Sequence, residues 1–93
     1  MIESFKDDKT KAFAETGKTR GGWQSVASVA LRKIDMLNAA AELKDLASPP
    51  GNHLEALKGD RLGQHSIRIN DQWRICFRWT DAGPADVEIT DYH

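Results

Sequence analysis

The chain has 93 residues, of which 40% are hydrophobic and 29% are charged, and its formal net charge is −1. This length fits a single domain over residues 1–93, because domains cluster near roughly 100 to 150 residues and a second core would not fit. The mean hydropathy of −0.56 and the lack of an apolar run near the roughly 18 residues of a membrane span argue against a membrane-spanning helix.

The cysteine count and the first residues bear on the compartment. A single cysteine, Cys76, excludes an internal disulfide framework and a multi-cysteine zinc site. The N-terminus lacks the basic flank, apolar stretch and small-residue cleavage site of a signal peptide. We therefore expect a reducing, cytoplasmic location.

Charge is unevenly distributed along the chain. Residues 49–79 carry five basic and three acidic side chains, whereas residues 80–93 carry four acids and neither Lys nor Arg. A net charge of −1 argues against a protein that coats nucleic acid, because such binding depends on Lys and Arg neutralising phosphates. The distribution permits one local anion site on a near-neutral protein.

The first residues of the chain predict a strand and a short helix. An apolar lead at residues 2–5 suggests a first strand. Residues 8–15 then read as a short helix, with Asp7 or Asp8 as the N-cap and Gly17 ending it.

Residues 25–41 form the clearest predicted helix, and Ser25 can cap it. Residues 42–47 add a further turn before Pro49 and Pro50, which no helix interior tolerates. The apolar positions of the long helix recur at three- and four-residue spacing: Ala27, Ala30, Leu31, Ile34, Leu37 and Ala41.

After residue 51 the apolar period changes from that of a helix to two. This alternation predicts three strong strands and a weaker one. The positions that carry it are Leu54, Leu57, Ile67, Ile69, Trp73, Ile75, Phe77, Trp79, Val87 and Ile89. Helices first and an antiparallel sheet afterwards make an α+β fold, in which two N-terminal helices pack on one face of the sheet.

The register of the first hairpin follows from the apolar pattern, since the apolar side chains of neighbouring strands must share a face. A tight turn at residues 70–72 then pairs Ile67 with Ile75 and sets Arg68 directly opposite Arg74. Like charges in this position destabilise a sheet, so something else should lie between them.

The same rule for the second hairpin pairs Arg74 with Thr90 and Arg78 with Asp86. Arg78 thus gains a carboxylate, while Arg68 and Arg74 are predicted to remain unneutralised.

The Arg68/Arg74 pair can bind a phosphate, because planar guanidinium groups donate bidentate hydrogen bonds to phosphate oxygens. Two ordinary solvated arginines would give the same pattern. Lys58 and Arg61, between two predicted strands, can likewise grip a nucleic-acid backbone or belong to a solvated turn. Cys76 lies between apolar residues of a central strand, which predicts an inert packed thiol.

Several segments together resemble the HigB toxins of the RelE/ParE superfamily. The resemblance covers essentially the whole chain. It rests on residues 2–5 and 15–17, Leu57-Lys58-Gly59-Asp60-Arg61, Gly63-Gln64-His65-Ser66-Ile67-Arg68-Ile69-Asn70, Trp73-Arg74-Ile75-Cys76-Phe77 and the terminal Asp91-Tyr92-His93.

This resemblance implies a toxin that a HigA-like helix-turn-helix antitoxin neutralises, with operator DNA bound only through the antitoxin and no membrane partner. HigB-like toxins cleave messenger RNA in the decoding site of the 70S ribosome, without a metal or cofactor. The ribose 2′-hydroxyl attacks the adjacent phosphorus and the 5′-oxygen leaves.

Carried over by position, Asp91, Tyr92 and His93 match the terminal catalytic motif of the family, and Arg74 matches the arginine on the scissile phosphate. The resemblance thus implies His93 as a proton-transfer group, Arg74 with Arg68 as the phosphate clamp, Tyr92 as a stacking or hydrogen-bonding group, and Asp91 as an orienting residue.

The chain departs from the family at one catalytic position. Better-known HigB sequences read His-x-Leu-Lys-Gly, and Glu55 stands here at the place of that histidine. His53 lies two residues earlier, about 7 Å along a strand. Either Glu55 is the general base, or His53 reaches into the site, or the second proton-transfer group is dispensable, or both are only surface residues.

Two other functions compete with RNA cleavage. A ParE-like gyrase inhibitor would share the fold without the ribonuclease chemistry. A catalytically weak homologue that only binds its antitoxin would fit the near-zero net charge and the missing histidine.

Overall fold

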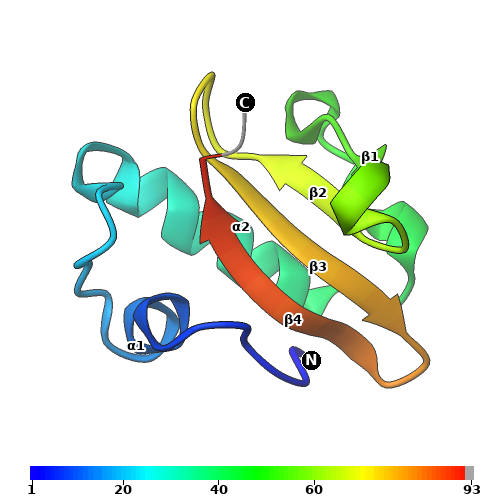
Figure 1. Ribbon diagram of the computed structural model, residues 1–93, viewed down its shortest axis with the longest axis horizontal. Helices are drawn as coiled ribbons and strands as arrows, with labels where there is room; N and C mark the ends of the chain where they lie inside the picture. The colour runs from blue at the N-terminus through cyan, green and yellow to red at the C-terminus, as the bar shows by residue number, and fades with distance from the viewer. Residues whose placement is uncertain (92–93) are drawn as a thin grey trace.

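The computed structural model describes residues 1–91, which form two α-helices and a four-stranded sheet (Figure 1). The α-helices are α1 (Asp8–Thr16) and α2 (Ala27–Ala39). The strands are β1 (Glu55–Ala56), β2 (His65–Arg68), β3 (Arg74–Thr80) and β4 (Gly83–Thr90). Short 3₁₀ turns occupy Gln24–Val26, Leu43–Ala47, Pro50–Asn52 and Gly59–Arg61. No helix of the described chain is long and apolar enough to cross a membrane.

The predicted first helix is confirmed together with its ends. The Asp7 carboxylate accepts a hydrogen bond from the Thr10 N–H at 2.8 Å, which satisfies one of the free donors of the first turn. Gly17 ends α1 in the left-handed conformation, at φ 76°.

The second helix begins later than predicted. Residues Gln24–Val26 form a 3₁₀ turn, so α2 starts at Ala27 and Ser25 does not cap it. Its last residue is Ala39, because Ala40 is already extended. The predicted further turn before the prolines is present as Leu43–Ala47.

All four strands pair antiparallel in the order β1-β2-β3-β4. The predicted register of the first hairpin is confirmed, including Ile67 opposite Ile75 and Arg68 opposite Arg74. Arg74 also lies opposite Thr90, as predicted.

The predicted first strand is reduced to one parallel bridge between Phe5 and Val87. The pairing of Arg78 with Asp86 is wrong in register, since Ala85 lies opposite Arg78. A bulge shifts β4 by one residue, and Asp86 takes φ 52°. The ion pair nevertheless forms, because the displaced Asp86 carboxylate accepts from Arg78 Nε at 2.8 Å.

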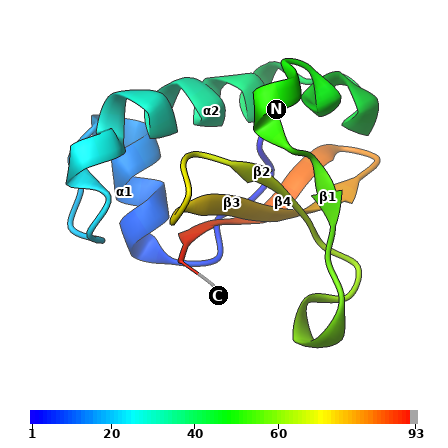
Figure 2. The same cartoon turned by 90° about the horizontal axis from the view of Figure 1, so that it is seen from above.

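The apolar core joins both helices to the sheet. Figure 2 shows α2 running along one side of the sheet. Each row of cross-strand partners shares a face, so Ile67, Ile75 and Ile89 point to the same side. These three belong to one buried cluster that also includes Phe13, Trp23, Ala30, Ile34, Leu37, Leu46, Ile69, Phe77 and Val87.

The alternate residues of the strands define the polar face of the sheet. One row across it is Glu55, Ser66, Cys76 and Glu88, and the next row is Arg68, Arg74 and Thr90. We call this side, with these seven residues, the polar face.

Cys76 is fully buried although it lies on the polar face, and the charged groups of Arg61, Glu88, Arg74 and Lys6 act on its thiol. Desolvation raises the pKa of the Cys76 thiol from its ordinary 9.0 to about 11, and the nearby guanidinium of Arg61 opposes this rise. The predicted packing of Cys76 is confirmed, and its inertness stays a prediction that the raised pKa supports.

The raised pKa makes stability depend on alkaline pH. An unfolded chain releases the thiol proton near pH 9, and the folded chain only near pH 11, so the folded state loses stability as the pH rises through this interval. We expect the free energy of unfolding of the wild type to fall there relative to Cys76→Val, which has no thiol proton. Denaturant titrations of both proteins at successive pH values would measure the difference, and parallel pH profiles would contradict it.

Candidate functional site

Arg74 is held on the polar face by partners from several segments of the chain. Its Nε donates to Ser66 Oγ at 2.9 Å, and one Nη donates to the His53 carbonyl at 2.9 Å. The Glu55 carboxylate lies 3.7 Å from the same Nη. These partners come from β2, from the loop before β1 and from β1 itself, so three segments together fix one guanidinium.

Arg74 remains partly accessible to solvent, since 17% of its side chain is exposed. A guanidinium has five N–H donors, and Ser66 and His53 take one each. Donors therefore remain for an anion on the polar face.

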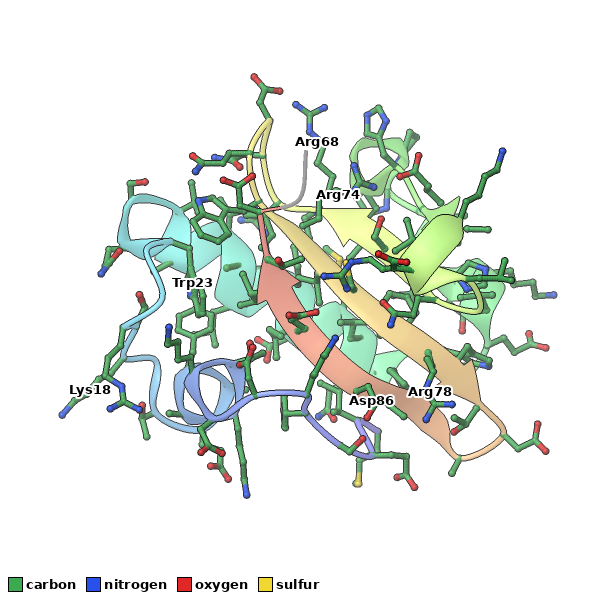
Figure 3. The ribbon with its side chains drawn as sticks, in the orientation of Figure 1. Lys18, Trp23, Arg68, Arg74, Arg78 and Asp86 are labelled. Atoms are coloured by element: carbon green, nitrogen blue, oxygen red, sulfur yellow. The ribbon has the colours of Figure 1, made fainter. Side chains whose placement is uncertain are left out.

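Arg68 lies opposite Arg74, and both side chains extend at the hairpin end of β2 and β3 (Figure 3). The prediction that this pair is unneutralised is wrong. Arg68 forms an ion pair with Asp71 from the hairpin loop, while Glu55 from β1 balances Arg74. Asp71 and Glu55 lie outside β2 and β3, so the register of these two strands alone could not predict either partner.

The two candidates for the missing family histidine have different surroundings. Glu55 pairs with Ser66 across the sheet, and 55% of its side chain is exposed beside Arg74. His53 contributes its backbone carbonyl to Arg74, and its residue is exposed in a left-handed conformation at φ 45° and ψ 54°. The Glu55 carboxylate thus adjoins the held guanidinium through its side chain, whereas the contact made by His53 comes from the backbone.

Arg61 belongs to a network over the polar face. Its Nη1 donates to Glu88 at 3.0 Å and to Gln64 at 3.1 Å, and Lys6 lies 3.8 Å from the same Glu88 carboxylate. Lys58 is an exposed residue just before the Gly59–Arg61 turn. Of these two predicted substrate-binding cations, Arg61 is therefore committed to an internal ion pair.

The terminal motif is described only in part. Asp91 Oδ2 accepts a hydrogen bond from Gln72 Nε2 of the hairpin at 3.0 Å. This contact holds Asp91 beside the β2–β3 turn that also carries Asp71. Tyr92 and His93 lie outside the described residues.

Sequence reasoning missed two contributors to the site, Ser66 and the His53 carbonyl. Ser66 could have been found from the register, since it lies diagonal to Arg74 on the same face and is the polar residue of a buried strand. A backbone carbonyl has no sequence signal. Over residues 1–91, no group of three or more His, Cys, Asp or Glu side chains is placed to hold a metal ion.

The chain matches known proteins over its whole length. The family described as "RelE-like toxin of type II toxin-antitoxin system HigB" matches residues 3–93. Toxin HigB-1 of Vibrio cholerae serotype O1 is 40% identical over 82 residues, which covers 87% of this chain and 86% of that protein. Endoribonuclease HigB of Proteus vulgaris is 32% identical over 99 aligned positions, which covers both chains completely.

A solved structure shares the fold. The YoeB-YefM complex from Staphylococcus aureus contains a chain that superposes with a TM-score of 0.55 at 21% identity, covering 100% of this chain and 98% of that one. The residues that carry the resemblance, from the Leu57–Arg61 segment to Arg74 and Asp91, thus stand in a chain that matches from end to end. This chain belongs to the HigB family of RelE-like toxins of type II toxin-antitoxin systems.

Proposed function

We propose that this chain is an endoribonuclease that cleaves messenger RNA on the ribosome and that an antitoxin neutralises it. Family membership and the name of the Proteus vulgaris relative support the activity. The observation that carries it in this chain is the Arg74 guanidinium, which is fixed by Ser66 and His53 and keeps donors for a phosphate.

In the proposed reaction the ribose 2′-oxygen forms a bond to the adjacent phosphorus and the bond to the 5′-oxygen breaks. The products are a 2′,3′-cyclic phosphate and a free 5′-hydroxyl. Negative charge grows on the non-bridging oxygens as the 2′-oxygen attacks, so a positioned guanidinium stabilises the transition state more than the ground state. Arg74 takes this role, and Arg68 adds positive charge beside it.

Two proton transfers complete the reaction. We assign the proton of the 2′-hydroxyl to the Glu55 carboxylate, because it adjoins the guanidinium that would hold the phosphate. The proton for the 5′-oxygen is assigned to His93, whose residue type titrates near neutral pH. Tyr92 is proposed to stack on a base and Asp91 to orient its neighbours, while His53 acts through its carbonyl.

The charge of the chain bears on where it acts. A net charge of −1 argues against tight binding of free RNA, and Arg61 and Arg78 are committed to internal ion pairs. The ribosome would supply the positioning that weak binding of free RNA lacks. We therefore propose cytoplasmic action on RNA in the 70S decoding site, without a metal.

The antitoxin is proposed to be a HigA-like helix-turn-helix protein. The chain is proposed to act as one domain with both helices on the apolar side of the sheet, which leaves the polar face for RNA. Lys58 would contact the RNA backbone from its exposed turn.

Replacing Arg74 tests the phosphate role. In cells briefly induced for Arg74→Ala, we expect cleavage to fall by about 10²- to 10³-fold, as for loss of one transition-state donor. Primer extension on messenger RNA from induced cells measures the cuts. In cells also treated with an inhibitor of translation initiation, the wild-type cuts should vanish if cleavage requires the ribosome. Arg78→Ala is the matched control, because it removes an arginine from the same strand at the far end of the sheet (Figure 3).

Wild-type cuts in Arg74→Ala would contradict the assignment. Growth arrest without cuts in the wild type would favour a gyrase-inhibiting toxin. Absence of both would favour a homologue that only binds its antitoxin.

The two proton-transfer roles can be separated with a substrate whose leaving 5′-oxygen is replaced by sulfur. A thiolate leaves without a proton, since a thiol is far more acidic than an alcohol. We expect His93→Gln to cleave the oxygen substrate about 10²- to 10⁴-fold more slowly than the wild type and to recover on the sulfur substrate. Glu55→Gln should remain slow on both.

Ribosome complexes programmed with the two messages would give these rates in single-turnover assays. If the cleavage rate of Glu55→Gln recovered on the sulfur substrate, Glu55 would be the proton donor and the two assignments would be reversed. If the rate of His93→Gln did not recover, His93 would not be the proton donor. Asp81→Asn is a control for loss of an acid remote from the site, because Asp81 lies in the exposed β3–β4 turn.

A further inference from the structure

The carbonyl that holds Arg74 comes from a residue in an uncommon backbone conformation. His53 follows the Pro50–Asn52 turn with φ 45° and ψ 54°, and its N–H donates to the Pro50 carbonyl at 3.1 Å. Residues other than glycine adopt this left-handed region rarely, and they stay in it only where their surroundings fix them. Something must therefore hold this loop so that the His53 carbonyl faces Arg74.

Asn52 is the buried residue that holds it. It is fully buried, and its Nδ2 donates to the Leu46 carbonyl at 3.1 Å and to the Ser48 carbonyl at 3.3 Å. Its Oδ1 accepts a hydrogen bond from Lys33 Nζ of α2. One amide thus ties the loop to the preceding turn and to a helix.

Lys33 is also nearly buried, with 8% of the residue exposed. Burial, assisted by the neighbouring charge of Arg32, lowers the pKa of Lys33. A buried amine that loses its acceptor is unfavourable, so the Lys33–Asn52 bond and the loop position depend on each other.

We infer that Asn52 is a positioning residue for the phosphate-binding arginine, because it fixes the His53 carbonyl that holds Arg74. This inference rests on the proposed function of Arg74. If the loop relaxes, the carbonyl turns away and one Nη loses its partner. The guanidinium is then free to turn toward the Glu55 carboxylate, 3.7 Å away, which would occupy both the cation and the proposed base.

A direct test measures how tightly Arg74 is held, without any cleavage assay. In full-length chain labelled with ¹⁵N-arginine, the rate of rotation about the Nε–Cζ bond of Arg74 is measured by NMR. We expect Asn52→Ala to raise this rate about tenfold, as for loss of one hydrogen bond to a charged group. Lys33→Met, which removes one of the bonds of Asn52, should act in the same direction with a smaller effect.

Ile34→Ala is the control for general loss of stability, since Ile34 is a core residue of the same helix as Lys33 and its apolar side chain cannot take part in the hydrogen bonds that hold the loop. Its Arg74 rotation rate should equal that of the wild type. An unchanged rate in Asn52→Ala, or the same increase in Ile34→Ala, would overturn the inference. If Asn52→Ala fails to fold, the rotation rate of Arg74 is compared between Lys33→Met and Ile34→Ala. A higher rate in Lys33→Met supports the inference, and equal rates overturn it.

A second test is a double-mutant cycle in cleavage. Alone, Asn52→Ala should lower kcat about tenfold or more, since a small displacement of a catalytic group is costly. In the Arg74→Ala background it should cause no further loss, because its effect passes through Arg74. If the double variant instead loses the product of the two single fold-losses in kcat, Asn52 acts independently of Arg74. Its role would then be merely structural, and the inference would be overturned.

The two tests separate the inference from the proposal it rests on. Wild-type cleavage by Arg74→Ala would refute the proposed function, while the rotation rates would still show whether Asn52 positions the guanidinium.

Discussion

The repulsion between two arginines that lie directly opposite each other on neighbouring strands determines how the site is arranged. The apolar residues of β2 and β3 must share the core face, and this requirement sets Arg68 against Arg74. Like charges in that position repel, so each needs a partner from elsewhere. Asp71 of the hairpin takes Arg68, and the loop before β1 comes to Arg74 with Glu55 and the His53 carbonyl.

The same arrangement distinguishes Arg74 from other arginines on and beside the sheet. Arg78 is paired with the carboxylate displaced by the bulge, and Arg61 with Glu88, at distances of 2.8 and 3.0 Å. Arg74 is instead fixed by a hydroxyl and a backbone carbonyl, which carry no net charge, while its carboxylate lies at 3.7 Å. A cation held mainly by neutral groups keeps more attraction for an added anion than one in a close ion pair.

The fold was largely predictable because its apolar pattern is regular. Alternation fixed the β2–β3 pairing, and Asp7 and Gly17 marked the ends of α1 by the chemistry of their side chains. The bulge at Asp86 and the 3₁₀ turn that displaces Ser25 were not predictable, since each depends on tertiary packing that overrides local preference.

The site was predictable only where side chains define it. The repulsion between Arg68 and Arg74 pointed to the site. It also predicted that both arginines lack a carboxylate partner, which is wrong because Asp71 and Glu55 lie outside the two strands considered. The role of the His53 carbonyl depends on a left-handed φ that Asn52 fixes from a buried position, and a backbone group leaves no residue signal.

The central claim is that the Arg74 guanidinium binds the phosphate at the point of cleavage. Its most direct measurement is the structure of this chain on a 70S ribosome whose message carries a 2′-O-methyl group at the cleavage site, which blocks the attack. The account predicts that the message lies on the polar face, with a non-bridging phosphate oxygen within about 3 Å of an Arg74 nitrogen. A message that contacts another surface, with Arg74 bound only to Ser66, His53 and Glu55 of its own chain, would contradict it.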